Sequence, residues 1–179
     1  MDIEKLRFPI GEYTAPELIS EIQVKQWINE ISLLPSQLRV ATLQLSEDQL
    51  NTPYRPGGWT AKQVIHHLAD SHMNSYIRFK LAVTEENPTI RPYFEERWAE
   101  CQEAKHADIE VSLTLLEALH KRWVLFLESL PDQDWDKTFY HPENKRTSAL
   151  KEVVGLYAWH GKHHLNHILG VSQTGFRYT

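Results

Sequence analysis

The chain has 179 residues, of which 41% are hydrophobic and 24% are charged, and its formal net charge is −5. These values are typical of a soluble globular protein, and we expect one domain over residues 1–179. The negative charge, without a compensating basic stripe, argues against nucleic-acid binding. Apolar runs are only a few residues long, no secretory signal is evident, and the single Cys101 excludes an intramolecular disulfide. We therefore predict a cytoplasmic protein that does not bind membranes.

The first half of the chain predicts an N-terminal arm followed by two helices. Pro9 and Gly11 indicate that residues 1–15 form an extended arm. Apolar residues at helical spacing predict a helix over about 16–45, which Pro35 should kink or interrupt. After a loop rich in Pro and Gly, the pattern Thr60-Ala-Lys-Gln63 is a capping box that predicts a helix over about 61–84.

The second half predicts two more helices. A polar connection over residues 87–107 should contain one short helix around 94–103. Asp108 is a suitable cap for a helix over about 109–130, and a fourth helix is expected over about 148–169, after a loop. The β-strand signal is weak throughout. The prediction is therefore an all-α protein, a four-helix bundle with an extended N-terminal arm and one long crossover connection.

A cluster of histidines carries the strongest chemical signal. Four of the ten histidines lie between residues 160 and 167. His160 and His164 are four residues apart, so their imidazoles should lie on one helix face, where two neutral nitrogens can bind a transition metal. His163 is turned by about 100° from His164, and His167 lies at the edge of the apolar stripe.

A third ligand must come from another helix, and the residues leave two candidates on the helix over 61–84. His72 lies near the centre of the apolar stripe, whereas His67 lies about 100° from Leu68, on its flank. Periodicity alone favours His72.

Three segments carry a family resemblance: Leu6–Gly11, Gly57–Phe79 and Tyr157–His167. On these residues the chain resembles the DinB/YfiT-like metalloprotein family, most closely the YfiT branch, which is labelled as metal-dependent hydrolases. The resemblance implies His67 as the third ligand beside His160 and His164. It also implies a homodimer and a relation to S-transferases that use bacillithiol, mycothiol or glutathione.

Three neutral imidazoles leave a coordination position open, as in catalytic zinc sites. One divalent transition metal per chain is expected, with zinc favoured and nickel as the alternative. The metal could activate either water or a low-molecular-weight thiol as its thiolate. Gly161 occupies the place where zinc peptidases of the HExxH kind have their glutamate base, which modestly favours a thiol. His163 and His167 are candidate proton shuttles, and Asp70 is a candidate acceptor that orients an imidazole.

The remaining predictions concern a small-molecule substrate and its pocket. With His67 as the ligand, His72 becomes a pocket residue together with Arg78 and Tyr157, and Arg78 could bind the carboxylate of a thiol cofactor. The other histidines (His106, His120 and His141) are interpreted as surface residues, and Cys101 as a spectator thiol. The alternative to an enzyme is a non-catalytic, metal-stabilised helical module that binds a partner or responds to stress.

Overall fold

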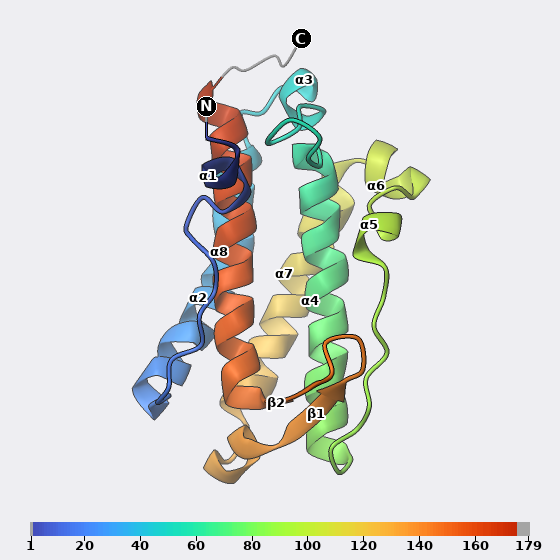
Figure 1. Cartoon of the computed structure of the whole chain (residues 1–179). Coiled ribbons are helices and arrows are strands. Elements are labelled where there is room, and N and C mark those ends of the chain that lie inside the picture. The colour runs from blue at the N-terminus through green and yellow to red at the C-terminus, as the bar shows by residue number, and fades with distance from the viewer. Residues whose placement is uncertain (1, 175–179) are drawn as a thin grey trace.

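The computed structural model describes residues 2–174, and four long helices form a bundle within them (Figure 1). These helices are α2 (Glu21–Thr42), α4 (Ala61–Thr84), α7 (Ile109–Glu128) and α8 (Leu150–Thr174). Helices α2 and α4 each pack against both α7 and α8. The predicted four-helix bundle is confirmed. Within the described residues, no helix is both long and apolar enough to span a lipid bilayer.

The connection between α4 and α7 is the long crossover. It leaves the lower end of α4 in Figure 1, returns along the outside of that helix and enters α7 at the upper end. As a result α4 and α7 run in the same direction, opposite to α2 and α8. The connection holds two short helices, α5 (Glu95–Trp98) and α6 (Gln102–His106), where the sequence predicted one. Both contact α4, so polar residues of the crossover lie beside the bundle.

Several short elements were not predicted. The N-terminal arm is not wholly extended, because α1 (Ile3–Arg7) forms one turn capped by the Asp2 carboxylate. The predicted loop over 131–146 instead contains η1 (Asp132–Asp136) and strand β1 (Thr138–His141), which pairs antiparallel with β2 (Arg146–Ala149). A further short helix is α3 (Glu47–Leu50). Strands of four residues with one buried side chain, Phe139, give little alternation for a sequence pattern to detect.

Local capping fixes where the long helices begin. The Thr60 hydroxyl accepts a hydrogen bond from the Gln63 backbone N–H at 3.1 Å, and the Gln63 side chain accepts one from the Thr60 N–H at 3.0 Å. This capping box starts α4 where the sequence places it. Helix α2 begins at Glu21, later than the predicted start at residue 16, because the Ser20 hydroxyl caps the Gln23 N–H.

Pro35 lies inside α2 but does not interrupt it, contrary to one of the two expected outcomes. Proline has no N–H, so the carbonyl of Ile31 loses the donor that an ordinary helix residue would supply four positions later. That carbonyl instead accepts a hydrogen bond from Nδ1 of His120 on α7, at 2.7 Å. A side chain from a neighbouring helix thus satisfies the backbone group that proline leaves open.

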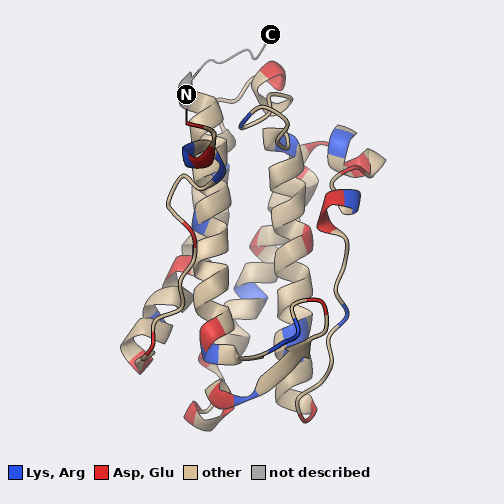
Figure 2. Ribbon diagram, viewed as in Figure 1, with Lys and Arg blue, Asp and Glu red and all other residues tan. Residues whose placement is uncertain are grey.

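The apolar core is divided into two clusters by a layer of histidines. One cluster joins residues 24–31 of α2 to the adjoining halves of the other long helices, and the second joins Leu34 and Leu38 to the opposite halves. Between them lie His72, His120 and His160, two of which are essentially inaccessible to solvent. These histidines form a polar layer inside the bundle, halfway along its length. Charged residues, in contrast, collect at the bundle ends and on the crossover, and the middle of α8 carries few of them (Figure 2).

The surroundings of two glycines on α8 predict opposite effects of alanine substitution on thermal stability. A Cβ at Gly155 would lie 2.9 Å from the Trp27 ring and 2.7 Å from the Tyr13 hydroxyl, whereas none of the described residues places an atom within 4 Å of a Cβ at Gly170. Overpacking costs about 1–3 kcal/mol, against a helix-propensity gain of about 1 kcal/mol. We expect Gly155→Ala to lower the thermal midpoint by a few degrees and Gly170→Ala to leave it unchanged or raise it. Calorimetry measures both, and an equal response at the two positions would contradict the close contact of α8 with Trp27.

Candidate metal centre

Three imidazoles from two helices converge at the middle of the bundle. His67 projects from α4, and His160 and His164 project from successive turns of α8. One ligand nitrogen from each of the three lies within 4.8 Å of the others. Nε2 of His67 and Nε2 of His160 are 3.3 Å apart. The structure therefore brings together the three residues that the family resemblance selects.

This donor set fits a divalent transition metal. Two nitrogens bound tetrahedrally at about 2.0–2.1 Å lie roughly 3.3 Å from each other, which matches the His67–His160 separation. Burial lowers the pKa of His67 to about 4, with His163 adding to the effect. Burial also lowers the pKa values of His160 and His164 well below the ordinary histidine value. The rings are therefore neutral near pH 7, the form in which imidazole binds metal.

His72, the ligand that periodicity favours, lies on the other side of His160. Nε2 of His72 is 3.1 Å from Nδ1 of His160, whereas His67 faces Nε2 of the same ring. Nδ1 of His72 is 2.9 Å from Nε2 of His120. His72, a predicted pocket residue, is fully buried and is not among the residues that line either cavity beside the histidines. His120, interpreted from the sequence as a surface residue, is 1% exposed.

The other histidines of α8 form a second group beside the first. Nδ1 of His167 is 3.3 Å from Nδ1 of His164, and its Nε2 donates to the Arg7 carbonyl at 3.2 Å. His163 stacks on Trp159 with ring centroids 4.5 Å apart, and its Nδ1 is buried without a partner among the described residues. His163, His164 and His167 are also close enough to hold an ion.

Asp70 lies apart from these rings. Burial, with Glu103 nearby, raises the pKa of its carboxyl to about 6. In the described part of the chain, no hydrogen bond joins this carboxylate to His67 or to the histidines of α8. Its role in orienting an imidazole therefore stays a prediction.

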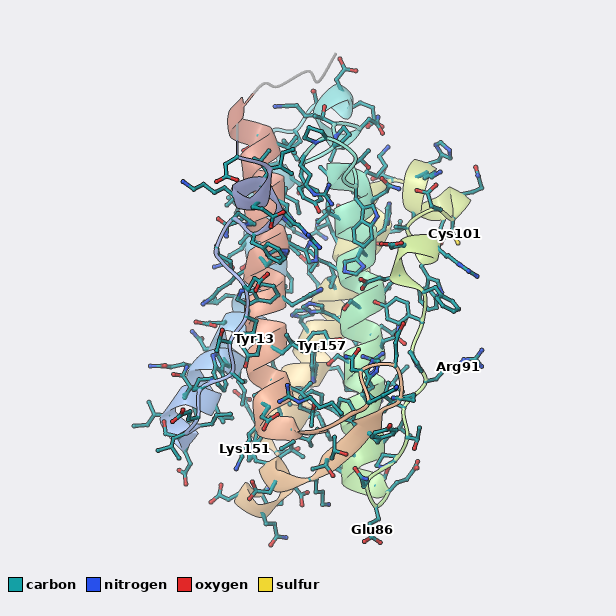
Figure 3. The ribbon with its side chains drawn as sticks, in the orientation of Figure 1. Tyr13, Glu86, Arg91, Cys101, Lys151 and Tyr157 are labelled. Atoms are coloured by element: carbon teal, nitrogen blue, oxygen red, sulfur yellow. The ribbon has the colours of Figure 1, made fainter. Side chains whose placement is uncertain are left out.

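Two cavities reach the histidine cluster, and His160 lines both. The first has a volume of about 600 Å³ and is also lined by Arg78, Tyr157 and His141. The second has a volume of about 630 Å³ and is lined by His67, His163 and His164, among others. Tyr157 projects from α8 toward α4 (Figure 3). Arg78 and Tyr157, the predicted pocket residues, line the first cavity together with His141, which was interpreted as a surface residue.

Sequence reasoning missed two carboxylates at the site. Glu95 and Glu96, at the start of α5, line both cavities with His160. Partial burial, with Glu96 and Glu143 nearby, raises the pKa of Glu95. No sequence pattern marks them, because they lie on the crossover, far from His67 in the sequence, and only the path of the crossover brings them to the site. They supply acidic groups that the histidine motif lacks.

The position of Gly161 excludes a glutamate base of the peptidase kind. A Cβ at this residue would lie 2.5 Å from Cδ2 of Leu34, a buried side chain of α2. Residue 161 therefore faces α2 and leaves no space for a side chain. Any carboxylate base must come from elsewhere in the fold.

Comparison with known proteins agrees with this geometry. The sequence pattern of the DinB superfamily matches residues 30–168. A relative from Bacillus cereus (strain 03BB102), provisionally named as a metal-dependent hydrolase, is 56% identical over 163 residues, which cover 91% of this chain and 93% of the relative. A Bacillus mycoides (strain KBAB4) protein with the same provisional name is 53% identical over 171 residues, covering 96% and 98% of the two chains.

A solved structure shares the whole architecture. It is described as "YfiT from Bacillus subtilis is a probable metal-dependent hydrolase with an unusual four-helix bundle topology". It is 49% identical in sequence, has a TM-score of 0.93, and the match covers 97% of this chain and 99% of that one. The matches extend over nearly the full chain, including all four long helices and the histidine cluster. By sequence and by fold, this chain belongs to the DinB superfamily.

Proposed function

We propose that this protein is a metal-dependent hydrolase in which His67, His160 and His164 hold one zinc ion. The observation that carries the proposal is the 3.3 Å approach of two Nε2 atoms beside cavities that also contain carboxylates. A zinc ion held by three neutral imidazoles lowers the pKa of a coordinated water to about 7 and polarises a carbonyl oxygen. The provisional names of the relatives support the same reaction class.

The protein's own residues supply the remaining functions. Glu95, whose pKa is raised, can accept a proton at the cavity shared with His160. Arg78 lines the first cavity and makes no ion pair within the described residues, so it can bind a negatively charged group of a substrate. A small ester or amide that carries a carboxylate would match these groups.

The two cavities support a second candidate, transfer of a low-molecular-weight thiol. Both are lined by His160, and their volumes of about 600 and 630 Å³ suit two separate organic molecules. One could hold a thiol such as bacillithiol, with its carboxylate on Arg78, and the other an electrophile. The carboxylates at the site are the reason for placing hydrolysis first, because a metal-held thiolate needs no base.

Reaction with defined probes distinguishes the two functions. Zinc-loaded protein is assayed with a panel of carboxylate-bearing esters and amides, and separately with monochlorobimane plus bacillithiol, mycothiol or glutathione. We expect ester or amide turnover that falls by about 100-fold or more in Glu95→Gln, because a lost general base costs that much. Zinc content should be unchanged in this variant.

The matched control is Glu86→Gln, which changes an exposed glutamate just beyond the C-terminal end of α4 (Figure 3). It should retain full turnover. Thiol-dependent conjugation without hydrolysis would replace the first candidate with the second. Stoichiometric zinc with neither activity would contradict an enzymatic function and favour a metal-stabilised binding module.

A further inference from the structure

The buried histidines around the site form two hydrogen-bonded chains, each of which ends on a backbone carbonyl. The first, here called the His120 relay, runs from the Ile31 carbonyl through His120 and His72 to His160. The second, the His167 relay, runs from the Arg7 carbonyl through His167 to His164. Both end on an α8 histidine of the proposed metal site.

The direction of the His120 relay is fixed by its first bond. A carbonyl oxygen only accepts, so the proton of neutral His120 lies on Nδ1, 2.7 Å from the Ile31 oxygen. Its Nε2 must then accept from Nδ1 of His72 at 2.9 Å. Nε2 of His72 in turn accepts from Nδ1 of His160 at 3.1 Å. The lone pair of His160 is left on Nε2, the nitrogen that faces His67.

The His167 relay has the same polarity. Nε2 of His167 donates to the Arg7 carbonyl, which leaves its Nδ1 as an acceptor 3.3 Å from Nδ1 of His164. His164 therefore carries its proton on Nδ1 and its lone pair on Nε2. The two relays thus leave the same ring nitrogen, Nε2, unprotonated on each of the two α8 histidines.

Both carbonyls are available because helix geometry cannot satisfy them. Pro35 removes the N–H that would bond to Ile31 within α2. Arg7 is the last residue of α1, where carbonyls have no partner in their own helix. Neither relay is a chance contact of mobile side chains, because His72, His120 and His167 are at most 3% exposed.

We propose that His120, His72 and His167 are positioning residues that hold the protons of His160 and His164 on Nδ1, so that both rings present Nε2 to one metal ion. This rests on the metal site of the proposed function but not on any reaction at that site. Such partners fix the tautomer and orientation of ligand histidines, and their loss weakens metal binding by about 10–100-fold.

Zinc affinity, measured by competition with a chelator of known affinity, tests the proposal without any substrate. His72→Leu removes the acceptor for His160 and should weaken zinc binding by about 10–100-fold. His72→Gln keeps an acceptor oxygen and an N–H donor and should bind zinc within a few-fold of the wild type. His167→Leu and His167→Asn form the equivalent pair for the second relay.

The matched control is His66→Leu. His66 is a buried histidine of α4, the helix that also carries His72. Its Nδ1 contacts the Ser112 hydroxyl at 2.7 Å, and it belongs to neither relay. This variant should lose stability but not zinc affinity. Equal zinc affinities for wild type, His72→Leu and His72→Gln would overturn the His120 relay. Two zinc ions per chain, one of them lost in His167→Leu, would make His167 a ligand and overturn the second relay.

Nitrogen-15 NMR of the metal-free protein gives a readout that remains available if a leucine variant fails to fold. Two-bond proton–nitrogen correlations identify which ring nitrogen carries the proton. We expect His160 and His164 in the Nδ1–H form, and an Nε2–H form for either ring would overturn its relay. Failure of the wild type to bind zinc would instead contradict the proposed function, and the NMR result distinguishes these outcomes.

Discussion

Replacing His160 or His164 with alanine will produce a folded helical bundle that no longer retains one equivalent of zinc. Each substitution removes one of three nitrogens, and two neutral imidazoles cannot hold the ion against dialysis at low metal concentration. Elemental analysis after gel filtration should fall from about one zinc per chain to near zero, while the far-ultraviolet circular dichroism remains helical.

The stability of these variants gives a second measurement of the same effect. A ligand that binds only the folded state stabilises it by about 2.7 kcal/mol at 100 times its dissociation constant. Zinc should therefore raise the thermal midpoint of the wild type and of His106→Ala, in which an exposed histidine is removed. It should not raise the midpoint of His160→Ala or His164→Ala. Unchanged zinc content in both site variants would refute the metal centre.

Trp123→Ala should produce the largest loss of stability of any single truncation in the histidine layer. The indole is fully buried on α7 and packs edge-on against His72, His120 and Tyr157, with centroid distances of 5.7–5.9 Å. Removing it costs about 3–5 kcal/mol, which for a chain of this size lowers the thermal midpoint by roughly 6–20 °C.

The matched control is Trp98→Ala, because Trp98 on α5 is 38% exposed. Its thermal midpoint should change by only a few degrees. Because Trp123 also supports the His120 relay, Trp123→Ala should weaken zinc binding even at temperatures where the variant is fully folded. A midpoint shift no larger than that of Trp98→Ala would show that the indole is not part of the packed core.

The long helices were predictable because periodicity and capping are local signals. Thr60 and Gln63 define the start of α4 within the sequence itself, and the four-residue spacing of His160 and His164 places both on one face of α8. His120 could also have been recognised as buried, since it follows Leu116 by four residues and precedes Trp123 by three, on the apolar stripe of α7.

The third histidine required information that periodicity does not contain. His67 and His72 both contact His160, through different ring nitrogens, so the choice between them depends on the relative rotation of two helices. Glu95 was beyond prediction because its position depends on the path of the crossover. The hairpin of β1 and β2 was missed because its strands are only four residues long and bury a single side chain, Phe139.

The N-terminal segment that contains α1 hydrogen-bonds to side chains of α8 beside the proposed metal site. The Arg7 carbonyl accepts from His167, and further along the arm the Gly11 carbonyl accepts from the Trp159 indole at 3.3 Å. Trimming the first ten residues, or fusing a bulky tag that pulls them from α8, would remove the Arg7 acceptor of His167. We therefore expect it to weaken metal binding at the proposed site, although Arg7 and His167 are 160 positions apart in the chain. In recombinant protein these first residues are best retained, because they hydrogen-bond to His167 and Trp159 of α8.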